Sequence, residues 1–401
     1  MINRRMMFRG TAASAAMGAI FKNRVAEAAE AGKSLAAEVK DLNFRGRDGR
    51  LQLLGALDLE SKHDFSYGVR LMQGKKMRET AQAMFMRALD KKGVKSEALM
   101  TVDEVMKAIE ADPAINIAQK TWLFNQRIMW KSLQDFFHEN ADFYLAEMES
   151  FDKVGPGKLE LNPNMEIPSE ARHEIHIQPG GYVGDPFAGH IYHYGTNSFY
   201  ISVLGHNEQD QIHKKTVARL PTPADGKVKR ILDMGCGIGQ FTTALKERFP
   251  DAEVWGIDVG APMVRYGHTR AQKIGIGANF AQRLAQDTKF PDNYFDITVS
   301  YIMHHEMPAE STLKVINEAR RVTRSGGIYY PIDFNTRGTN KGTAWGMYGL
   351  WFDSRWNDEV WHQEFDAMNF TAEIGRRGFT APKEPVIALP GFGVRHFIRN
   401  A

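Results

Sequence analysis

The sequence predicts an α/β fold with a doubly wound parallel sheet in the C-terminal part, preceded by a mainly helical N-terminal domain. Three observations lead to this prediction. Residues Val228 to Leu245 read as an apolar strand, a glycine-rich turn and an amphipathic helix. Acidic residues, Asp258 and Asp287, follow later in the same part of the chain. Residues 67–151 carry apolar side chains at spacings of three and four, which is the period of a helix.

The glycine-rich turn has the pattern Asp233-x-Gly235-x-Gly237-x-Gly239. Glycine allows the backbone to turn sharply and to approach a ligand without a Cβ atom in the way. A dinucleotide fingerprint would read G-x-G-x-x-G, but the third glycine comes one residue early and Gln240 stands where a glycine is needed. A phosphate-binding P-loop would need Gly-Lys-Ser/Thr, which is missing from the turn. The spacing therefore disfavours a nicotinamide oxidoreductase.

This turn resembles motif I of the class I S-adenosylmethionine (SAM) methyltransferases. The resemblance implies a Rossmann-like sheet of seven strands with SAM as the cofactor, bound through Asp233, Gly235, Gly237 and Gly239. Ala252 to Asp258 reads as a second strand that ends in an acid. In the resembled family this acid binds both ribose hydroxyls of SAM, a bidentate task that suits a carboxylate. The resemblance also implies that Asp287 lies beside the adenine amino group.

The next segments continue the pattern. We expect the fourth strand of the sheet at Phe295 to Ile302 and the fifth at Ile328 to Phe334. A helix from Leu313 to Thr323 should lie between strands four and five. A turn at Ser325 to Gly327 should end that helix. The resemblance covers residues 228–334 well and the remaining tail loosely, and it reaches the superfamily rather than one enzyme.

Length, charge and cysteine content limit the classes of function that the chain can have. The chain has 401 residues, enough for more than one domain, and a net charge of +3, which argues weakly against a dedicated nucleic-acid binder. Its single cysteine, Cys236, excludes an internal disulfide. No apolar run is long enough to span a bilayer, so a membrane partner is not expected.

Residues 1–31 are set apart from the fold. Arg4-Arg5, Phe8-Arg9 and an alanine-rich run resemble a twin-arginine export signal, although Phe8 comes one position late. A basic N-terminal helix, or an over-long start of the reading frame, is the alternative. SAM is made in the cytoplasm and an exported enzyme would lack it, so we expect a cytoplasmic protein.

Residues 35–152 are predicted to form the helical N-terminal domain. Thr101 and Glu104 form a capping box, which starts a helix that should stop near Asp112-Pro113. Ile115 to Phe151 reads as a long helical stretch, broken once at most. Its aromatic stripe is best explained by burial in this domain. The alternatives are a homodimer surface through the N-terminal helices or a wall of the substrate site.

Residues 153–226 are rich in glycine and proline and are predicted to form a linker that folds over the cofactor. A short helix is expected from Glu208 to Val217. The segment also contains a histidine cluster, but no cysteines and no helical H-E-x-x-H motif accompany it, so no metal site is predicted. The histidines are His173, His176, His190, His193, His206 and His213.

Residues 227–401 form the expected SAM-binding domain. After strand five, Asn335 to Trp361 holds four of the seven tryptophans. This insertion either covers the carboxyl edge of the sheet or docks as a surface helix on the N-terminal domain. Phe365 to Arg377 reads as a helix, and Pro385 to Leu389 with Val394 to Ile398 as a closing hairpin.

Methyl transfer from a sulfonium mainly requires that the enzyme positions the acceptor and excludes water. A base helps only where the acceptor loses a proton. The expected end of strand four carries His304 and His305, whose ordinary pKa lies near neutrality, so either could act as a base. Asp333, at the end of strand five, is a second candidate to bind or deprotonate the acceptor.

The sequence therefore predicts a SAM-dependent methyltransferase that acts on a small, partly apolar molecule. The alternatives are an RNA or protein methyltransferase and a non-catalytic SAM-fold partner subunit. The Asp/Asn-Pro-Pro-aromatic motif of nucleic-acid amino methyltransferases is missing, and the acidic residues expected for SAM binding are intact. The sequence does not identify the acceptor or the methylated atom.

Overall fold

The computed structural model describes residues 47–54, 57–93, 101–199, 209–337, 343–384, 393–394 and 396–401. The chain divides into two compact units, one of Met1–Asp48 with Gln52–Glu60 and one of Gly49–Leu51 with Ser61–Ala401. The second unit contains the large sheet and the site described below. The expected export-like segment, His206 and the predicted strand at 385–389 lie outside the described residues. The boundaries at 152 and 226 stay a prediction.

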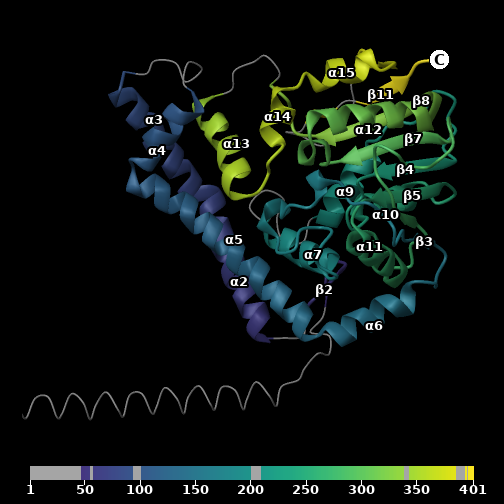
Figure 1. The fold of residues 1–401 in the computed structure, drawn as a ribbon, viewed down its shortest axis with the longest axis horizontal. Helices are drawn as coiled ribbons and strands as arrows, with labels where there is room; N and C mark the ends of the chain where they lie inside the picture. The colour runs from purple at the N-terminus through teal and green to yellow at the C-terminus, as the bar shows by residue number, and fades with distance from the viewer. Residues whose placement is uncertain are drawn as a thin grey trace, which may run out of the picture. The chain divides into compact units, whose positions relative to one another are not determined.

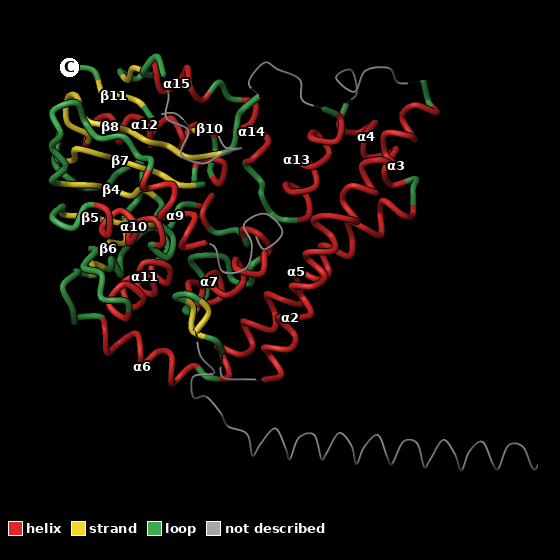
Figure 2. Tube along the Cα trace, turned by 180° about the vertical axis from the view of Figure 1, so that it is seen from behind, coloured by secondary structure: helices red, strands yellow, loops and turns green. Residues whose placement is uncertain are grey.

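A parallel sheet with antiparallel strands at one edge organises the second unit. Its strands run in the order β3-β6-β5-β4-β7-β8-β11-β9, and β10 pairs with β8 (Figures 1 and 2). The pairs from β3 to β8 are parallel, whereas β9, β10 and β11 pair antiparallel. The strands are β3 (Leu159–Glu160), β4 (Arg230–Met234), β5 (Glu253–Asp258), β6 (Asn279–Gln282), β7 (Phe295–Tyr301), β8 (Thr323–Asp333), β9 (Phe379–Thr380), β10 (Gly393–Val394) and β11 (Phe397–Arg399). Two further strands are β1 (Arg47–Asp48) and β2 (Leu51–Gln52).

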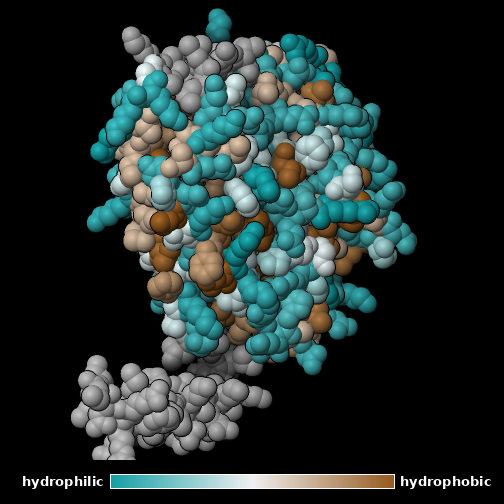
Figure 3. All heavy atoms as spheres, turned by 60° about the vertical axis from the view of Figure 1, so that its left-hand side comes forward, coloured by the Kyte–Doolittle hydropathy of each residue, from teal (hydrophilic) through white to brown (hydrophobic). Residues whose placement is uncertain are grey.

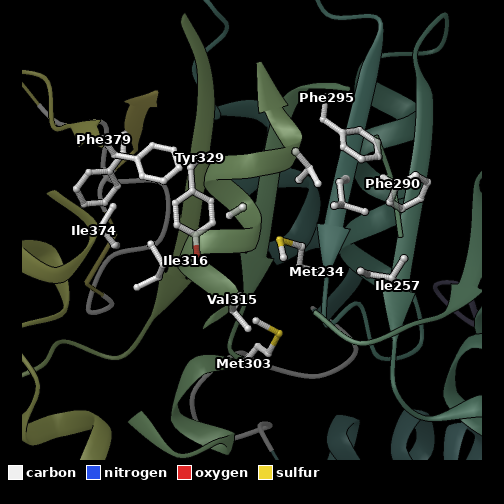
Figure 4. Close-up of a cluster of buried hydrophobic side chains, with 14 of the residues drawn as sticks. Met234, Ile257, Phe290, Phe295, Met303, Val315, Ile316, Tyr329, Ile374 and Phe379 are labelled. Carbon is white, nitrogen blue, oxygen red and sulfur yellow. The ribbon is translucent and has the colours of Figure 1, made fainter. Parts of the chain in front are cut away.

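Helices cover both faces of this sheet, as the doubly wound prediction requires. On one face α12 (Ala309–Val322), α14 (His362–Ala367) and α15 (Phe370–Arg376) bury an apolar cluster against the strands. Figure 4 shows Phe379 and Ile374 of the C-terminal segment beside Tyr329 of β8. The other face is covered by α9 (Gln209–Ala218), α10 (Gln240–Arg248) and α11 (Ala261–Lys273).

The sheet differs from the prediction in detail. The expected turn at 325–327 lies inside β8, as a bulge between the Phe295–Thr323 and Ile297–Ile328 pairs, with Gly326 at φ 70°. Burial of the flanking residues in the sheet keeps the strand paired across the bulge. The predicted helix at 365–377 is interrupted between α14 and α15. Beyond the seven strands expected, the 153–226 segment contributes the short edge strand β3.

The N-terminal helices follow the predicted capping signals. Thr101 and Glu104 form the capping box at the start of α4, and Asp112 caps α5 ahead of Pro113. The long helical stretch breaks once, at Asn140. The elements are α2 (Leu57–Met72), a π-helical turn (Gln73–Met77), α3 (Arg78–Lys91), α4 (Val102–Glu110), α5 (Pro113–Glu139) and α6 (Ala141–Phe151).

The tryptophan-rich insertion forms α13 (Ala344–Trp356), which docks on the N-terminal helices. Tyr348 and Phe352 of α13 are buried in one apolar cluster with Phe85 of α3 and Ile109 of α4. The docked surface helix is therefore confirmed for α13. The first residue of α14, His362, stacks on Phe334 next to the carboxyl end of β8, and Glu359, between α13 and α14, matters for the site below.

The outward faces of α2 and α5 carry exposed apolar side chains. Phe124 is 67% exposed and Phe65 is 73% exposed. Figure 3 brings this side forward and shows brown, hydrophobic residues between hydrophilic ones. Pairing of two copies through these helices stays a prediction. No helix among the described residues has the length and apolar character that a membrane span requires.

The 153–226 segment contains a helix that the sequence reasoning did not expect. Helix α7 (Ala188–Phe199) crosses α5, and Gly195 lies against the ring of Trp130 at the crossing. A Cβ atom on Gly195 would lie 1.8 Å from Cζ3 of Trp130. The glycine, unfavourable to an isolated helix, is therefore required by packing.

We expect Gly195→Ala to destabilise the protein although alanine favours helices. Overpacking against the buried indole should lower the free energy of unfolding by about 1–3 kcal/mol. The replacement of glycine by alanine in a helix raises it by only about 0.5–1 kcal/mol. Gly349→Ala in α13 is the matched control, because no heavy atom lies within 4 Å of its added Cβ. Urea unfolding should show the first variant less stable and the second equal to or above the wild type. Equal stability of the two variants would contradict this packing.

Candidate functional site

The glycine turn joins β4 to α10 with three left-handed residues. Gly235, Gly237 and Gly239 have φ values of 69°, 52° and 70°. A Cβ on Gly235 would lie 2.2 Å from Sδ of Met303, and one on Gly239 would lie 2.2 Å from Cε1 of Phe280. Only glycine fits both the backbone angles and the close approach of these two side chains.

Asp258 at the end of β5 ties this turn to the neighbouring strand. Its Oδ2 accepts a hydrogen bond of 2.9 Å from the amide of Gly237, and its Oδ1 accepts one of 2.9 Å from the amide of Gly260. Burial raises the pKa of Asp258, and the backbone amides partly oppose that rise. The carboxylate keeps lone pairs for a ligand, because each oxygen can accept more than one hydrogen bond.

Asp233 lies at the end of β4 and is fully buried. Its Oδ2 accepts a hydrogen bond of 2.6 Å from the hydroxyl of Thr242, whereas Oδ1 has no hydrogen-bond partner in the part of the chain that the structure describes. Burial raises the pKa of Asp233 to about 7. A cationic group placed beside Oδ1 would stabilise the ionised form of this acid.

Asp287 lies apart from these two acids. Its side chain is 50% exposed and pairs with Lys289. Leu284, Ala285 and Gln286 line the cavity described next, but Asp287 does not. The structure therefore does not bring Asp287 together with Asp233 and Asp258, and its role at the adenine stays a prediction.

A cavity of about 340 Å³ opens at the carboxyl ends of β4, β5, β6 and β7, the edge where open α/β sheets bind ligands. The residues that follow β4, β5 and β6 form one half of its wall, including Asp233 and Asp258. The residues that follow β7 and β8 form the other half, which meets the 168–192 segment. That half is largely apolar and aromatic, with Ile175, Tyr192, Tyr301, Ile302, Met303, Met307 and Phe334.

His304 lies behind this wall rather than in it. Its Nε2 is 3.1 Å from the hydroxyl of Ser300 and 3.0 Å from the hydroxyl of Tyr329, and its ring packs on Phe370. Burial lowers the pKa of His304 to about 4, so the ring is neutral at physiological pH. These are the surroundings of a histidine in the core.

His305 and Asp333 form a buried pair next to it. Asp333 Oδ1 lies 2.7 Å from His305 Nδ1. Asp333 Oδ2 accepts hydrogen bonds from the amides of Met303 and His304, at 3.1 and 2.7 Å. Although burial alone would lower the pKa of His305, Asp333 and Glu306 raise it well above the ordinary value. Neither side chain of the pair lines the cavity, so the catalytic roles of His304, His305 and Asp333 stay predictions.

Sequence reasoning missed two acids at the same place. Glu306 follows the two histidines in a short 3-10 turn (His304–Glu306) and lines the cavity. Glu359 follows α13, and its Oε1 lies 2.7 Å from Nδ1 of His176, which also lines the cavity. The position of Glu306 directly after His305 could have indicated it. For Glu359, no motif or spacing in the neighbouring sequence indicated a position at the site.

The histidine spacings noted in the sequence do not form a common site. His190 packs among Phe137, Tyr144 and Tyr266, and burial lowers its pKa to about 3. His193 Nδ1 lies 2.7 Å from the hydroxyl of Tyr266. Only His176 and His213 of the described cluster line the cavity.

A family model described as a methyltransferase domain matches residues 231–327. The demethylmenaquinone methyltransferase of Thermus thermophilus is 30% identical over 173 residues, which span 42% of this chain and 76% of that protein. The chain belongs to the class I SAM-dependent methyltransferases. Its cofactor is SAM, which supplies the methyl group in this family.

The other comparisons show lower sequence identity than the Thermus protein. A ubiquinone/menaquinone biosynthesis C-methyltransferase of Burkholderia mallei is 29% identical over 160 residues, 39% of this chain and 63% of that protein. Among solved structures, the PH0226 protein of Pyrococcus horikoshii has a TM-score of 0.37 at 16% identity, over 50% of this chain and 94% of that chain. Mitomycin 7-O-methyltransferase has a TM-score of 0.41 at 12% identity, over 54% of this chain and 58% of that chain.

Asp233 predicts a pH dependence of SAM binding by this methyltransferase. An acid whose pKa is about 7 is mostly neutral at pH 6 and mostly ionised at pH 7.5. An ordinary α-amino group stays cationic below about pH 7.7, so the attraction between this acid and the amino-acid end of SAM should grow as pH rises through that window. We expect affinity from calorimetry to increase by about five- to tenfold from pH 6 to pH 7.5.

Asp233→Asn is the control for this dependence, because its amide does not titrate. The variant should bind SAM with nearly constant affinity over the same window. A wild-type profile without slope, or the same slope in the variant, would show that Asp233 does not carry the effect.

Proposed function

We propose that the cavity binds SAM in the half formed after β4, β5 and β6 and a small, largely apolar acceptor in the half formed after β7 and β8. The observation that carries the proposal is the continuity of one cavity from the acids at the strand ends to an aromatic wall. Its volume of about 340 Å³ is of the order found for small-molecule sites.

The residues of the cofactor half fit SAM. Gly237 leaves open space beside the turn, because only Cε of Met263 comes within 4 Å of a Cβ added there. Asp258 offers two carboxylate oxygens to the ribose hydroxyls, and Oδ1 of Asp233 remains available to a cation. SAM supplies, when bound, a methyl group that is already activated on a sulfonium.

The protein's own contribution to the reaction is then mainly positional. The aromatic residues Tyr192, Tyr301 and Phe334 form a wall that excludes water and orients a flat acceptor. A base is needed only where the acceptor must lose a proton. Glu306 and His176 line the cavity, as do Glu170 and His213, so each of them is better placed than His304 or His305 to contact an acceptor.

The relatives support a quinol-like acceptor. The names of the Thermus and Burkholderia proteins refer to methylation of menaquinone and ubiquinone precursors. An apolar, aromatic half-cavity suits such a ring.

We further propose that the enzyme works in the cytoplasm, where SAM is made. The homodimer through the N-terminal helices also stays a proposal.

Substitution of Asp258 and of Asp287 tests the cofactor half. Asp258→Asn should weaken SAM binding about tenfold or more, since a charge-assisted hydrogen bond contributes about 1.5–3 kcal/mol. Asp287→Asn should change it less than about twofold, because that side chain is exposed and paired with Lys289.

Calorimetry with SAM, and with NAD as the ligand that should not bind, gives the measurement. Equal losses in the two variants would refute the assignment of Asp258. Binding of NAD without SAM would refute the proposed function as a whole.

Transfer of a labelled methyl group tests the acceptor half. We expect label from SAM to enter low-mass, organic-soluble products when the enzyme is given reduced demethylmenaquinone and simpler hydroquinones. Total RNA and total protein serve as competing acceptors. Label in either macromolecule would favour the RNA or protein methyltransferase, whereas SAM binding without transfer to any fraction would favour the non-catalytic subunit.

A further inference from the structure

Two histidines and two glutamates from distant parts of the chain meet at the wall of the acceptor half of the cavity. His176 comes from the segment that precedes α7, His305 and Glu306 follow β7, and Glu359 lies between α13 and α14. All four side chains are buried or nearly so. Such a cluster is costly to bury unless each charge has a partner.

Each histidine is oriented by a carboxylate on its Nδ1 atom. His176 Nδ1 lies 2.7 Å from Oε1 of Glu359, and His305 Nδ1 lies 2.7 Å from Oδ1 of Asp333. With a carboxylate beside each Nδ1, the Nε2 atom of each ring faces the opposite way. Both Nε2 atoms approach Oε1 of Glu306, at 3.9 Å for His176 and 3.4 Å for His305. Histidines that bind metals are commonly held in this manner.

The backbone around His176 is fixed in an unusual conformation. Its φ is 57°, which few residues other than glycine adopt. Its carbonyl oxygen accepts hydrogen bonds of 2.8 Å from Nε2 of Gln126 and of 2.8 Å from Nε1 of Trp130, both on α5. Backbone strain retained by several contacts is characteristic of functional sites.

Two carboxylate oxygens of the cluster have no hydrogen-bond partner among the described residues. They are Oε2 of Glu306 and Oε2 of Glu359, and Glu359 is only 4% exposed. Oε2 of Glu359 points toward the cluster, 3.7 Å from Nε2 of His305. An unsatisfied buried carboxylate oxygen is unfavourable, and an ion between these atoms would satisfy it.

The spacing of these atoms suits a metal ion. Donor atoms of His176, Glu306 and Glu359 all lie within 4.8 Å of one another. The 3.4, 3.7 and 3.9 Å separations around Glu306 and His305 are too long for strong hydrogen bonds. In a tetrahedral zinc site each ligand atom lies about 2.0–2.1 Å from the ion, which places two ligand atoms about 3.4 Å apart. The separations in the cluster are close to that spacing.

We propose that His176, His305, Glu306 and Glu359 bind a divalent transition-metal ion of the Zn²⁺ type. Two imidazoles with carboxylates favour such an ion over Mg²⁺ or Ca²⁺, which prefer oxygen ligands alone. Binding releases any proton held on the two Nε2 atoms, so the ion replaces protons and leaves the net charge of the cluster similar. His176 and Glu306 line the cavity, so the ion faces it.

The metal site extends the proposed function. Only the role of the ion toward the acceptor rests on that function. An ion at this position would bind an oxygen atom of the acceptor and lower the pKa of a hydroxyl there. This would explain why the acceptor half contains charged side chains in an otherwise apolar wall. Binding of the ion itself requires no assumption about the acceptor.

Metal titration of the full chain tests the site. The protein, freed of any affinity tag and treated with chelator, is titrated with Zn²⁺ by calorimetry and with Co²⁺ by visible absorption. We expect one ion per chain and a Co²⁺ spectrum of low-symmetry coordination by nitrogen and oxygen. Glu306→Gln and His176→Gln should each weaken binding at least about tenfold.

Glu170→Gln and His213→Gln are matched controls, because both residues line the same cavity outside the cluster. The controls should bind metal like the wild type. SAM affinity, measured in parallel, should be near normal in all four variants, which separates loss of the ion from loss of the fold.

Absence of Zn²⁺ and Co²⁺ binding by the wild type would overturn the proposal. Unchanged binding in Glu306→Gln and His176→Gln would overturn it as well. Failure of the proposed methyl transfer with intact metal binding would leave the site standing, so the two proposals fail separately.

Discussion

The buried carboxylate of Asp333 is the contact on which the proposed acceptor half of the cavity depends. It accepts from the amides of Met303, His304 and Phe334 and from the ring of His305. These donors join the chain that leaves β7 to the end of β8 and shape the short turn that ends in Glu306. Without this acid, the backbone amides would be left unpaired in an apolar environment, where each costs about 1–3 kcal/mol.

The N-terminal helices act as part of the same wall. Helix α5 reaches His176 through Gln126 and Trp130, and α13 docks on α3 and α4 while the chain beyond it supplies Glu359. Residues outside the matched methyltransferase domain at 231–327 thus supply His176 and Glu359 to the proposed acceptor half.

Local patterns made the cofactor side predictable. Strand, glycine turn and helix at 228–245 are each determined by neighbouring residues, and the structure has them within a few positions. Helix α7 was missed because its glycines and aromatic residues are stabilised by packing against Tyr266 and Trp130. The pairing of His176 with Glu359, and the outward position of Asp287, arise from tertiary contacts that no spacing in the sequence encodes.

The single cysteine of the chain lies in the glycine turn and lines the cavity. Burial, together with Asp258 and Asp233, raises the pKa of the Cys236 thiol well above its ordinary value. At neutral pH the sulfur therefore stays protonated, and a thiol is a far weaker nucleophile than a thiolate. An enzyme that handles an alkylating cofactor thus keeps its one thiol in a form that resists being alkylated itself.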